Sequence, residues 1–101
     1  MPEMRFHVRW PDDSRSLCYS PSSTIREAFT VGRRYPLAEF VQRSREALTH
    51  ASERVAQRYG FGCGQALAQI RLIEEQAQSF AATQDAVVVV EGFEFAAGEP
   101  R

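Results

Sequence analysis

The sequence contains no lysine and no asparagine, so all twelve of its basic side chains are arginine. Without lysine the chain has no side-chain amine, so it cannot form a Schiff base through a lysine side chain. Each basic contact that it can make uses a planar guanidinium, which stays charged at physiological pH. The thirteen acidic residues bring the net charge to −1, so no strong field recruits nucleic acid or an acidic membrane.

Long apolar runs and paired cysteines are missing as well. No run approaches the length of a membrane-spanning helix, and residues 1–10 lack the uninterrupted apolar segment of a signal peptide. Cys18 and Cys63 are far apart and belong to no CxxC motif, so we expect two reduced thiols. These absences together predict a cytoplasmic protein.

The residues that are present fit one small globular domain. The chain has 101 residues, of which 44% are hydrophobic and 25% are charged. These proportions are ordinary for a globular protein, and a second hydrophobic core would be too small to be stable. We therefore expect a single domain over residues 1–101, with frayed ends at residues 1–3 and 96–101.

The strongest periodic pattern runs from residue 36 to residue 59 and predicts a long amphipathic helix. Its apolar side chains recur at helical spacing and gather on one side, while charged residues gather on the other. Pro36 suits the first helical position, and Gly60 suits the end. The apolar side comprises Leu37, Phe40, Val41, Leu48, Ala51, Val55 and Tyr59.

Two short alternating segments predict a β-hairpin near the N-terminus. Residues 4–10 and 15–20 alternate between apolar and polar side chains and flank the turn-forming residues 11–14. If all of 11–14 form the loop, Trp10 lies opposite Arg15, and apolar residues face apolar partners. The register then pairs Val8 with Leu17, Phe6 with Tyr19, Arg9 with Ser16, His7 with Cys18, and Arg5 with Ser20.

Three further elements complete the expected fold. Thr24 begins a capping box, which predicts a short helix over residues 24–31 with Gly32 as its terminator. A second apolar face predicts a helix over residues 64–82, which forms an antiparallel hairpin with the long helix. The valine-rich segment 86–95 predicts a final strand whose first residues are covered on both faces.

These elements predict an α+β fold of order ββαααβ. The expected sheet has three antiparallel strands in the order 2-1-3, so that the last strand lies beside the first. The helical hairpin and the short helix pack against one face of this sheet.

The polar face of the predicted hairpin is the best candidate site. Two guanidiniums, of Arg5 and Arg9, flank the predicted cross-strand pair of His7 and Cys18 and could hold a carboxylate or a phosphate. They would also lower the pKa of the thiol, which would make Cys18 a candidate nucleophile with His7 as its partner. Ser16 and Ser20 complete the ligand-binding candidates. The alternative is a solvated strand face on which Cys18 is only a small apolar residue.

Other site motifs in the sequence are weak. Gly60, Gly62 and Gly64 precede a helix, as in phosphate-binding loops, but those loops follow a strand rather than a helix. We interpret the glycines as a helix terminus. The histidines His7 and His50 and the two cysteines lack the spacing of a metal site, so we expect neither a metal nor a cofactor.

Four segments of the chain, in order, resemble the small bacterial nitrogen-starvation response proteins of the mycobacterial type. The resemblance covers residue 1 to about residue 75. One departure lies in the turn, where Asp13 stands in place of an expected glycine. The segments are MPEMRFHVRWPD at residues 1–12, CYSPS at 18–22, YPLAEFVQRSREALTHASERV at 35–55 and YGFGC at 59–63.

The resemblance implies which genes lie nearby, but it does not imply a reaction. Members of that family are encoded beside a nitrilase-type hydrolase, a radical-SAM protein, an acetyltransferase and a flavoprotein, and they bring no catalytic motif to transfer. We therefore expect a non-catalytic accessory or regulatory protein in nitrogen- or nitrile-related metabolism, which binds a partner enzyme or a small ligand. The alternatives are a small Cys/His-dependent enzyme or thiol carrier, and a ligand-binding homodimer. We expect no nucleic-acid or membrane partner.

Overall fold

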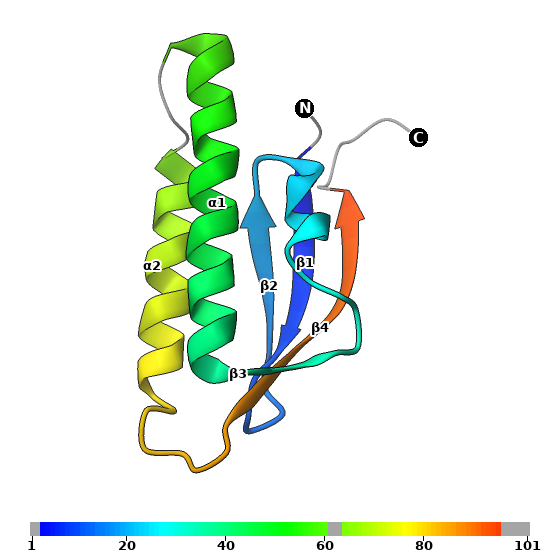
Figure 1. Ribbon diagram of the computed structural model, residues 1–101, viewed down its shortest axis with the longest axis vertical. Coiled ribbons are helices and arrows are strands. Elements are labelled where there is room, and N and C mark those ends of the chain that lie inside the picture. The colour runs from blue at the N-terminus through cyan, green and yellow to red at the C-terminus, as the bar shows by residue number, and fades with distance from the viewer. Residues whose placement is uncertain (1–2, 61–63, 96–101) are drawn as a thin grey trace.

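The computed structural model describes residues 3–60 and 64–95, which form an antiparallel sheet beside a helical hairpin (Figure 1). The strands follow the order β2-β1-β4-β3, and all neighbours are antiparallel. The elements are β1 (Met4–Arg9), β2 (Arg15–Ser20), the 3-10 helix η1 (Ser23–Glu27), β3 (Arg34–Pro36), α1 (Leu37–Tyr59), α2 (Gly64–Gln78) and β4 (Val87–Phe95).

The α+β class and the position of the last strand beside the first are confirmed, but the prediction of three strands was wrong. A fourth strand, β3, pairs with the first residues of β4 at the far edge of the sheet. It is three residues long and ends at Pro36, which cannot donate a backbone hydrogen bond. Such a short segment shows no period-two alternation, so the sequence pattern could not reveal it.

The short helix predicted over residues 24–31 is present, but its predicted length and its predicted cap were wrong. The chain forms only η1, and Ser22 rather than Thr24 caps it, because the Ser22 hydroxyl accepts a hydrogen bond from Thr24 N at 3.2 Å. The aromatic and β-branched residues that follow η1 are poor helix formers. Gly32 has the expected left-handed backbone (φ +85°), but it lies in a turn, where its N–H donates to Val90 O at 3.0 Å.

The long helix and the helical hairpin are confirmed. α1 begins directly after Pro36 and ends at Gly60, whose φ of +87° and N–H bond to Ala56 O (2.7 Å) close the last turn. α2 runs antiparallel beside α1 and ends at Gln78, earlier than predicted (Figure 1). Gly62 and Cys63 lie outside the described residues. So do residues 1–2 and 96–101 of the ends predicted to be frayed at 1–3 and 96–101.

The predicted register of the hairpin was wrong by one residue. β1 and β2 pair Phe6 with Cys18 and His7 with Leu17, where the prediction paired His7 with Cys18. The loop is tighter than expected, because Trp10 N–H donates to Ser14 O at 2.8 Å and Asp13 takes the left-handed backbone (φ +68°). A slip of one residue moves the whole set of β2 side chains to the opposite face.

The core fills the space between one face of the sheet and the helices. Trp10 packs edge-to-face on Phe40 (ring centroids 5.5 Å apart) and stacks on Phe80 (5.9 Å), and Phe29 lies 5.4 Å from Tyr35. Each such pair contributes about 0.5–1.5 kcal/mol beyond the burial of its area. Buried partners from the sheet and the helices are Met4, Phe6, Val8, Val88, Val90, Leu48, Ile70 and Ile73.

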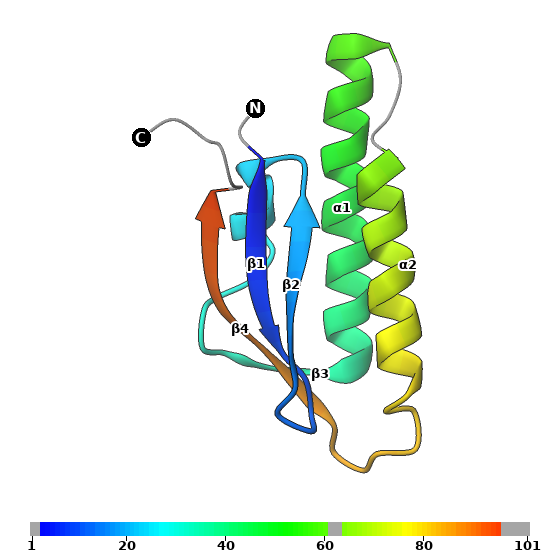
Figure 2. The same ribbon diagram turned by 180° about the vertical axis from the view of Figure 1, so that it is seen from behind.

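Within residues 3–60 and 64–95, no helix lies over the other face of the sheet, as Figure 2 shows from behind. The start of β4 was predicted to be covered on both faces, and Val88, Val89 and Val90 are all buried, although no helix among the described residues covers the second face. Val88 and Val90 face the core, whereas Val89 faces the uncovered side and is still only 8% exposed. Val89 lies between Arg9 and Arg34 of the neighbouring strands, whose aliphatic stems suit such a position.

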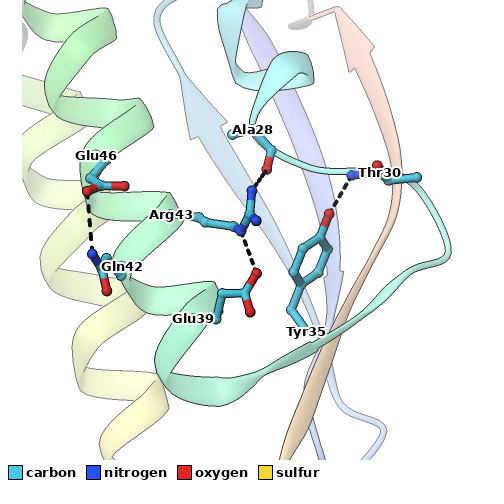
Figure 3. Close-up of polar contacts among 7 residues, drawn as sticks. All are labelled: Ala28, Thr30, Tyr35, Glu39, Gln42, Arg43 and Glu46. Carbon is cyan, nitrogen blue, oxygen red and sulfur yellow. Dashed lines mark hydrogen bonds and ion pairs between the residues drawn. The ribbon is translucent and has the colours of Figure 1, made fainter.

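Arg43 of α1 ties the segment after η1 to the helix (Figure 3). Its guanidinium donates to Glu39 Oε2 (2.7 Å) and to Ala28 O (3.2 Å), and it lies 5.3 Å from the ring of Tyr35. The buried Tyr35 hydroxyl accepts a hydrogen bond from Thr30 N at 2.7 Å. These contacts fix the path of the chain that leads from η1 into β3.

Candidate functional site

The uncovered face of the sheet, called the open face here, receives the odd-numbered residues of β1 and β2. Arg5, His7 and Arg9 lie on it, as predicted from their alternation, because their even-numbered neighbours are buried in the core. Because the β1–β2 register differs from the predicted one, the residues beside these three side chains also differ from the predicted ones. The β2 residues of the open face are Arg15, Leu17 and Tyr19, and β4 adds Glu91, Gly92 and Glu94.

Cys18 lies on the core face, opposite Phe6, and is only 2% exposed. Burial raises the pKa of its thiol from 9.0 to about 12, because a thiolate would lose its hydration there. The predicted lowering of that pKa by neighbouring arginines was therefore wrong. The structure does not bring His7 and Cys18 together, so they form no nucleophile–base pair.

Ser16 and Ser20 also face the core side, where each has a structural hydrogen bond. Ser20 is fully buried, and its hydroxyl donates to Ser22 O at 2.8 Å. The Ser16 hydroxyl accepts from Trp10 Nε1 at 2.9 Å, which satisfies the indole donor beside the core. Neither serine joins the arginines on the open face.

The polar side chains of the open face pair largely with one another. His7 Nε2 lies 2.5 Å from Glu94 Oε1, and both side chains are about half exposed (45% and 50%). Arg9 and Arg15 share the carboxylate of Glu91, at 3.6 Å and 2.8 Å. The hydrogen bond from Arg15 holds the pKa of Glu91 below its ordinary value.

A β-bulge places Glu91 in this position. The pairing of β1 with β4 shifts between His7, opposite Gly92, and Val8, opposite Val90, so Glu91 is the extra residue. The bulge puts a carboxylate where two arginines can reach it. Gly92 is the single local sign of this bulge in the sequence, since glycine in a strand interior often marks one.

A groove lies where the open face meets α2, and we call it the β2–α2 groove. Its volume is about 520 Å³, and its walls include two side chains that are half exposed or more, Leu17 (50%) and Leu72 (58%). Arg5 is its basic group and forms no ion pair with a residue in 3–60 or 64–95. The lining is completed by Glu3, Tyr19, Gln65, Ala68 and Gln69.

Gln69 closes the edge of the sheet at this groove. β2 is an edge strand, and its Tyr19 N–H, which points away from β1, donates to Gln69 Oε1 at 2.9 Å. The side-chain amide therefore takes the place of a neighbouring strand. A smaller hollow of about 290 Å³ continues past Gln69 and Leu72 toward Trp10.

Of the groove's residues, only Arg5 belonged to the predicted site. Leu72 lies off the apolar face of the helix predicted over residues 64–82, and this position is a local sign that its side chain has another partner. Tyr19 was placed toward the core by the wrong register, and its hydroxyl in fact donates to Glu3 Oε2 at 2.6 Å. Gln69 offered no pattern to detect, since its contact joins elements far apart in the sequence.

The described part of the chain shows neither a cluster of metal-ligating side chains nor a helix that could span a membrane. Over residues 3–60 and 64–95, no three His, Cys, Asp or Glu side chains converge as they would around a metal ion. Within the same ranges, neither helix combines the length and the apolar character that crossing a bilayer requires.

Fold and site together define a small α+β protein whose antiparallel sheet is covered on one face and open on the other. The family model of the nitrogen starvation-induced protein NitG matches residues 5–93. The chain therefore belongs to the NitG family, which confirms its resemblance to nitrogen-starvation response proteins. Comparison with curated proteins and with solved structures gave no match.

Proposed function

We propose that this protein is a non-catalytic accessory or regulatory protein of the nitrogen-starvation response, which acts by binding a small carboxylate-bearing ligand in the β2–α2 groove. The position of Arg5 is the observation that carries the proposal. Its guanidinium lines the groove without a carboxylate partner in the described residues, next to two exposed leucines. An arginine in that position can bind a carboxylate through two parallel hydrogen bonds.

The groove suits a small ligand in size and in chemistry. A volume of about 520 Å³ lies within the range of small-molecule sites. Leu17 and Leu72 offer apolar surface to an aliphatic body, while the amides of Gln65 and Gln69 offer donors beside the guanidinium. Glu3 lines the same groove, and its negative charge favours a singly charged carboxylate over a phosphate.

The chemistry around the groove supports binding rather than catalysis. Its lining residues among 3–60 and 64–95 include no serine, cysteine or histidine that could act as a nucleophile with an adjacent base. Cys18 is buried with a raised pKa, and His7 is held by Glu94 on the open face. The separate positions of Cys18 and His7 therefore give no support to the Cys/His-dependent enzyme.

The test is a titration of the ¹⁵N-labelled full chain with a panel of short-chain carboxylates and their uncharged amides. We expect one carboxylate to shift the amide signals of Tyr19 and Gln69, and its amide to bind at least about tenfold more weakly. Arg5→Gln should weaken binding to a similar degree. Arg71→Gln is the matched control, because Arg71 is an exposed arginine of α2 that does not line the groove. Equal binding by Arg5→Gln and the wild type would contradict the proposal.

A partner enzyme that docks on the open face is the second candidate. Arg9 and Arg15 share the single carboxylate of Glu91, so the middle of this face keeps an excess of positive charge for an acidic surface. Affinity capture from nitrogen-starved cells should recover one enzyme in stoichiometric amount with the wild type and with Arg71→Glu, but not with Arg15→Glu. Recovery by all three proteins would place the contact elsewhere.

The ligand-binding homodimer, joined through the open face or a sheet edge, makes a separate prediction. A second copy on the open face would bury the groove-lining Leu17. Size-exclusion chromatography at increasing concentration would then show a dimer whose formation changes with ligand. A strict monomer would rule this alternative out.

A further inference from the structure

The outer edge of β4 is half unpaired. β4 spans Val87–Phe95, but β3 pairs only with Val87, Val88 and Val89. Gly32 N–H extends this cover by one bond, to Val90 O. Beyond that point no other strand among residues 3–60 and 64–95 pairs with this edge, and Figures 1 and 2 both show the arrowhead end of β4 at the border of the sheet.

The direction of the backbone groups along β4 follows from the hairpin. The N–H and C=O of one residue point to the same side of a strand, and those of the next residue point to the other side. Trp10 N–H bonds to Ser14 O of the β2 side, so the even-numbered residues of β1 face β2 and the odd-numbered ones face β4. Gly92 and Glu94, which lie opposite odd-numbered residues of β1, therefore bond to β1.

Phe93 and Phe95 consequently direct their N–H and C=O groups away from β1, toward the unpaired edge. The bond from Gly32 to Val90 O supports this assignment, because Val90 lies opposite the even-numbered Val8 and faces outward in the same way. Strand edges with free backbone groups are templates for an additional strand.

The side chains at this edge select what can pair with it. Phe93 faces the core side, with its ring 6.5 Å from that of Phe6, and Phe95 is 47% exposed. Between them Glu94 lies on the open face, where His7 is its ion-pair partner within the described chain. An incoming strand therefore meets two aromatic side chains on one face and a carboxylate on the other.

A second copy of the chain fits this edge poorly. Antiparallel pairing uses the outward groups of both phenylalanines when Phe93 lies opposite the partner's Phe95. That register places Glu94 directly opposite the partner's Glu94, and like charges opposite one another destabilise a strand pair. A basic residue at the same position would instead be attracted.

We propose that the edge formed by Phe93, Glu94 and Phe95 binds an extended segment of another protein by strand addition, and that this segment alternates apolar, basic and apolar residues. Its backbone pairs with the outward groups of the two phenylalanines. Its basic side chain lies beside Glu94 on the open face, and its apolar side chains pack beside the aromatic rings. The site is separate from the β2–α2 groove, which lies at the opposite edge of the sheet.

The test uses the full chain and a capped peptide, Thr-Val-Arg-Val-Thr, with Thr-Val-Glu-Val-Thr as its matched control. In ¹⁵N-resolved titrations, the arginine peptide should shift the amide signals of residues 91–95 and bind more tightly than the glutamate peptide. Phe95→Pro removes one outward N–H without removing a bond to β1, and it should weaken binding about fivefold or more. Phe95→Leu is the matched variant, because it also loses the ring but keeps that N–H, and it should bind the arginine peptide more tightly than Phe95→Pro does. Glu94→Arg should reverse the preference between the two peptides.

Several outcomes would overturn the proposal. One is equal binding by Phe95→Pro and Phe95→Leu, and another is the absence of binding at millimolar peptide. Peptide shifts confined to β2 and α2 would also overturn it. A wild-type dimer that Phe95→Pro converts to a monomer would show that the edge pairs with a second copy instead.

Discussion

Cys18 lies directly opposite Phe6 in the β1–β2 pair, on the face of the sheet that packs against the helices. This position removes the thiol from solvent and from the arginines, which lie on the open face. Cys18 should therefore behave as a buried thiol and not as part of a His–Cys pair. Its reactivity and its effect on stability can both be measured.

Cys18 should react slowly with thiol reagents in the folded protein. A rise of its pKa from 9.0 to about 12 lowers the thiolate fraction at pH 8 roughly a thousandfold, and burial hinders access further. The measurement is the rate of alkylation by iodoacetamide in a Cys63→Ser background, with the urea-unfolded protein as control. A folded rate close to the unfolded one would place Cys18 in solvent.

The same thiol should make stability depend on pH in the alkaline range. The unfolded thiol ionises near 9.0, whereas the folded one ionises only near about 12. Between these values the unfolded state loses a proton that the folded state keeps, so the free energy of unfolding should fall by about 1.4 kcal/mol per pH unit. Urea titrations at pH 9 to 11 measure this slope, and Cys18→Ala should remove that part of it. Identical slopes would assign the dependence to other groups.

A glycine in the hairpin turn should increase the stability of the protein. Asp13 has a φ of +68°, a region in which glycine carries no steric cost, so Asp13→Gly should stabilise the protein by about 0.5 kcal/mol. Asp12→Gly is the contrasting variant and should destabilise it, because Asp12 Oδ1 accepts from Ser14 N (3.0 Å) and Ser14 Oγ (2.6 Å). Thermal unfolding of both variants tests the pair. Loss of stability in Asp13→Gly would show that the aspartate side chain is needed in the turn.

The same turn explains how far the fold could be predicted. The strands at residues 4–10 and 15–20 were recognisable from their alternation, but their register depends on the loop. Asp13 adopts a conformation that shortens the loop, and alternation alone does not reveal this. The prediction placed Leu17 and Tyr19 in the core because they are apolar, whereas both line the groove beside α2.

The candidate site was predictable only in part for a related reason. Alternation along β1 was enough to place Arg5, His7 and Arg9 on one face, since it is a property of one strand. The groove depends on contacts between β2 and α2, such as that of Tyr19 with Gln69, which no local pattern encodes. β3 was missed because three residues are too few to show a period.

Tyr35 should contribute to stability through its hydroxyl group as well as through its ring. It is almost fully buried, and its oxygen accepts the hydrogen bond from Thr30 N at 2.7 Å. Tyr35→Phe keeps the ring and leaves this N–H without its acceptor, so the free energy of unfolding should fall by about 1–2 kcal/mol. Tyr19→Phe, which loses an exposed bond to Glu3, should cost less in the same urea titration. An equal cost for both variants would mean that burial of the Tyr35 bond has no effect.

Two substitutions of Gln69 should distinguish its contribution to stability from its effect on ligand binding. Gln69→Leu removes the acceptor for Tyr19 N–H, so we expect a loss of about 1–2 kcal/mol in the free energy of unfolding. Gln69→Glu keeps an acceptor oxygen at the same position and should remain close to the wild type in stability. Its carboxylate lines the groove with Arg5, where it competes for the guanidinium and repels a ligand carboxylate.

Ligand binding by Gln69→Glu should therefore fall about tenfold while its unfolding curve changes little, measured by titration and urea unfolding of the same sample. A variant that folds and binds normally would show that the carboxylate of the ligand lies away from Arg5. A variant that loses stability and binding together would show that the amide hydrogens of Gln69 also support the fold. Only the loss of binding alone fits a groove in which Arg5 receives the ligand.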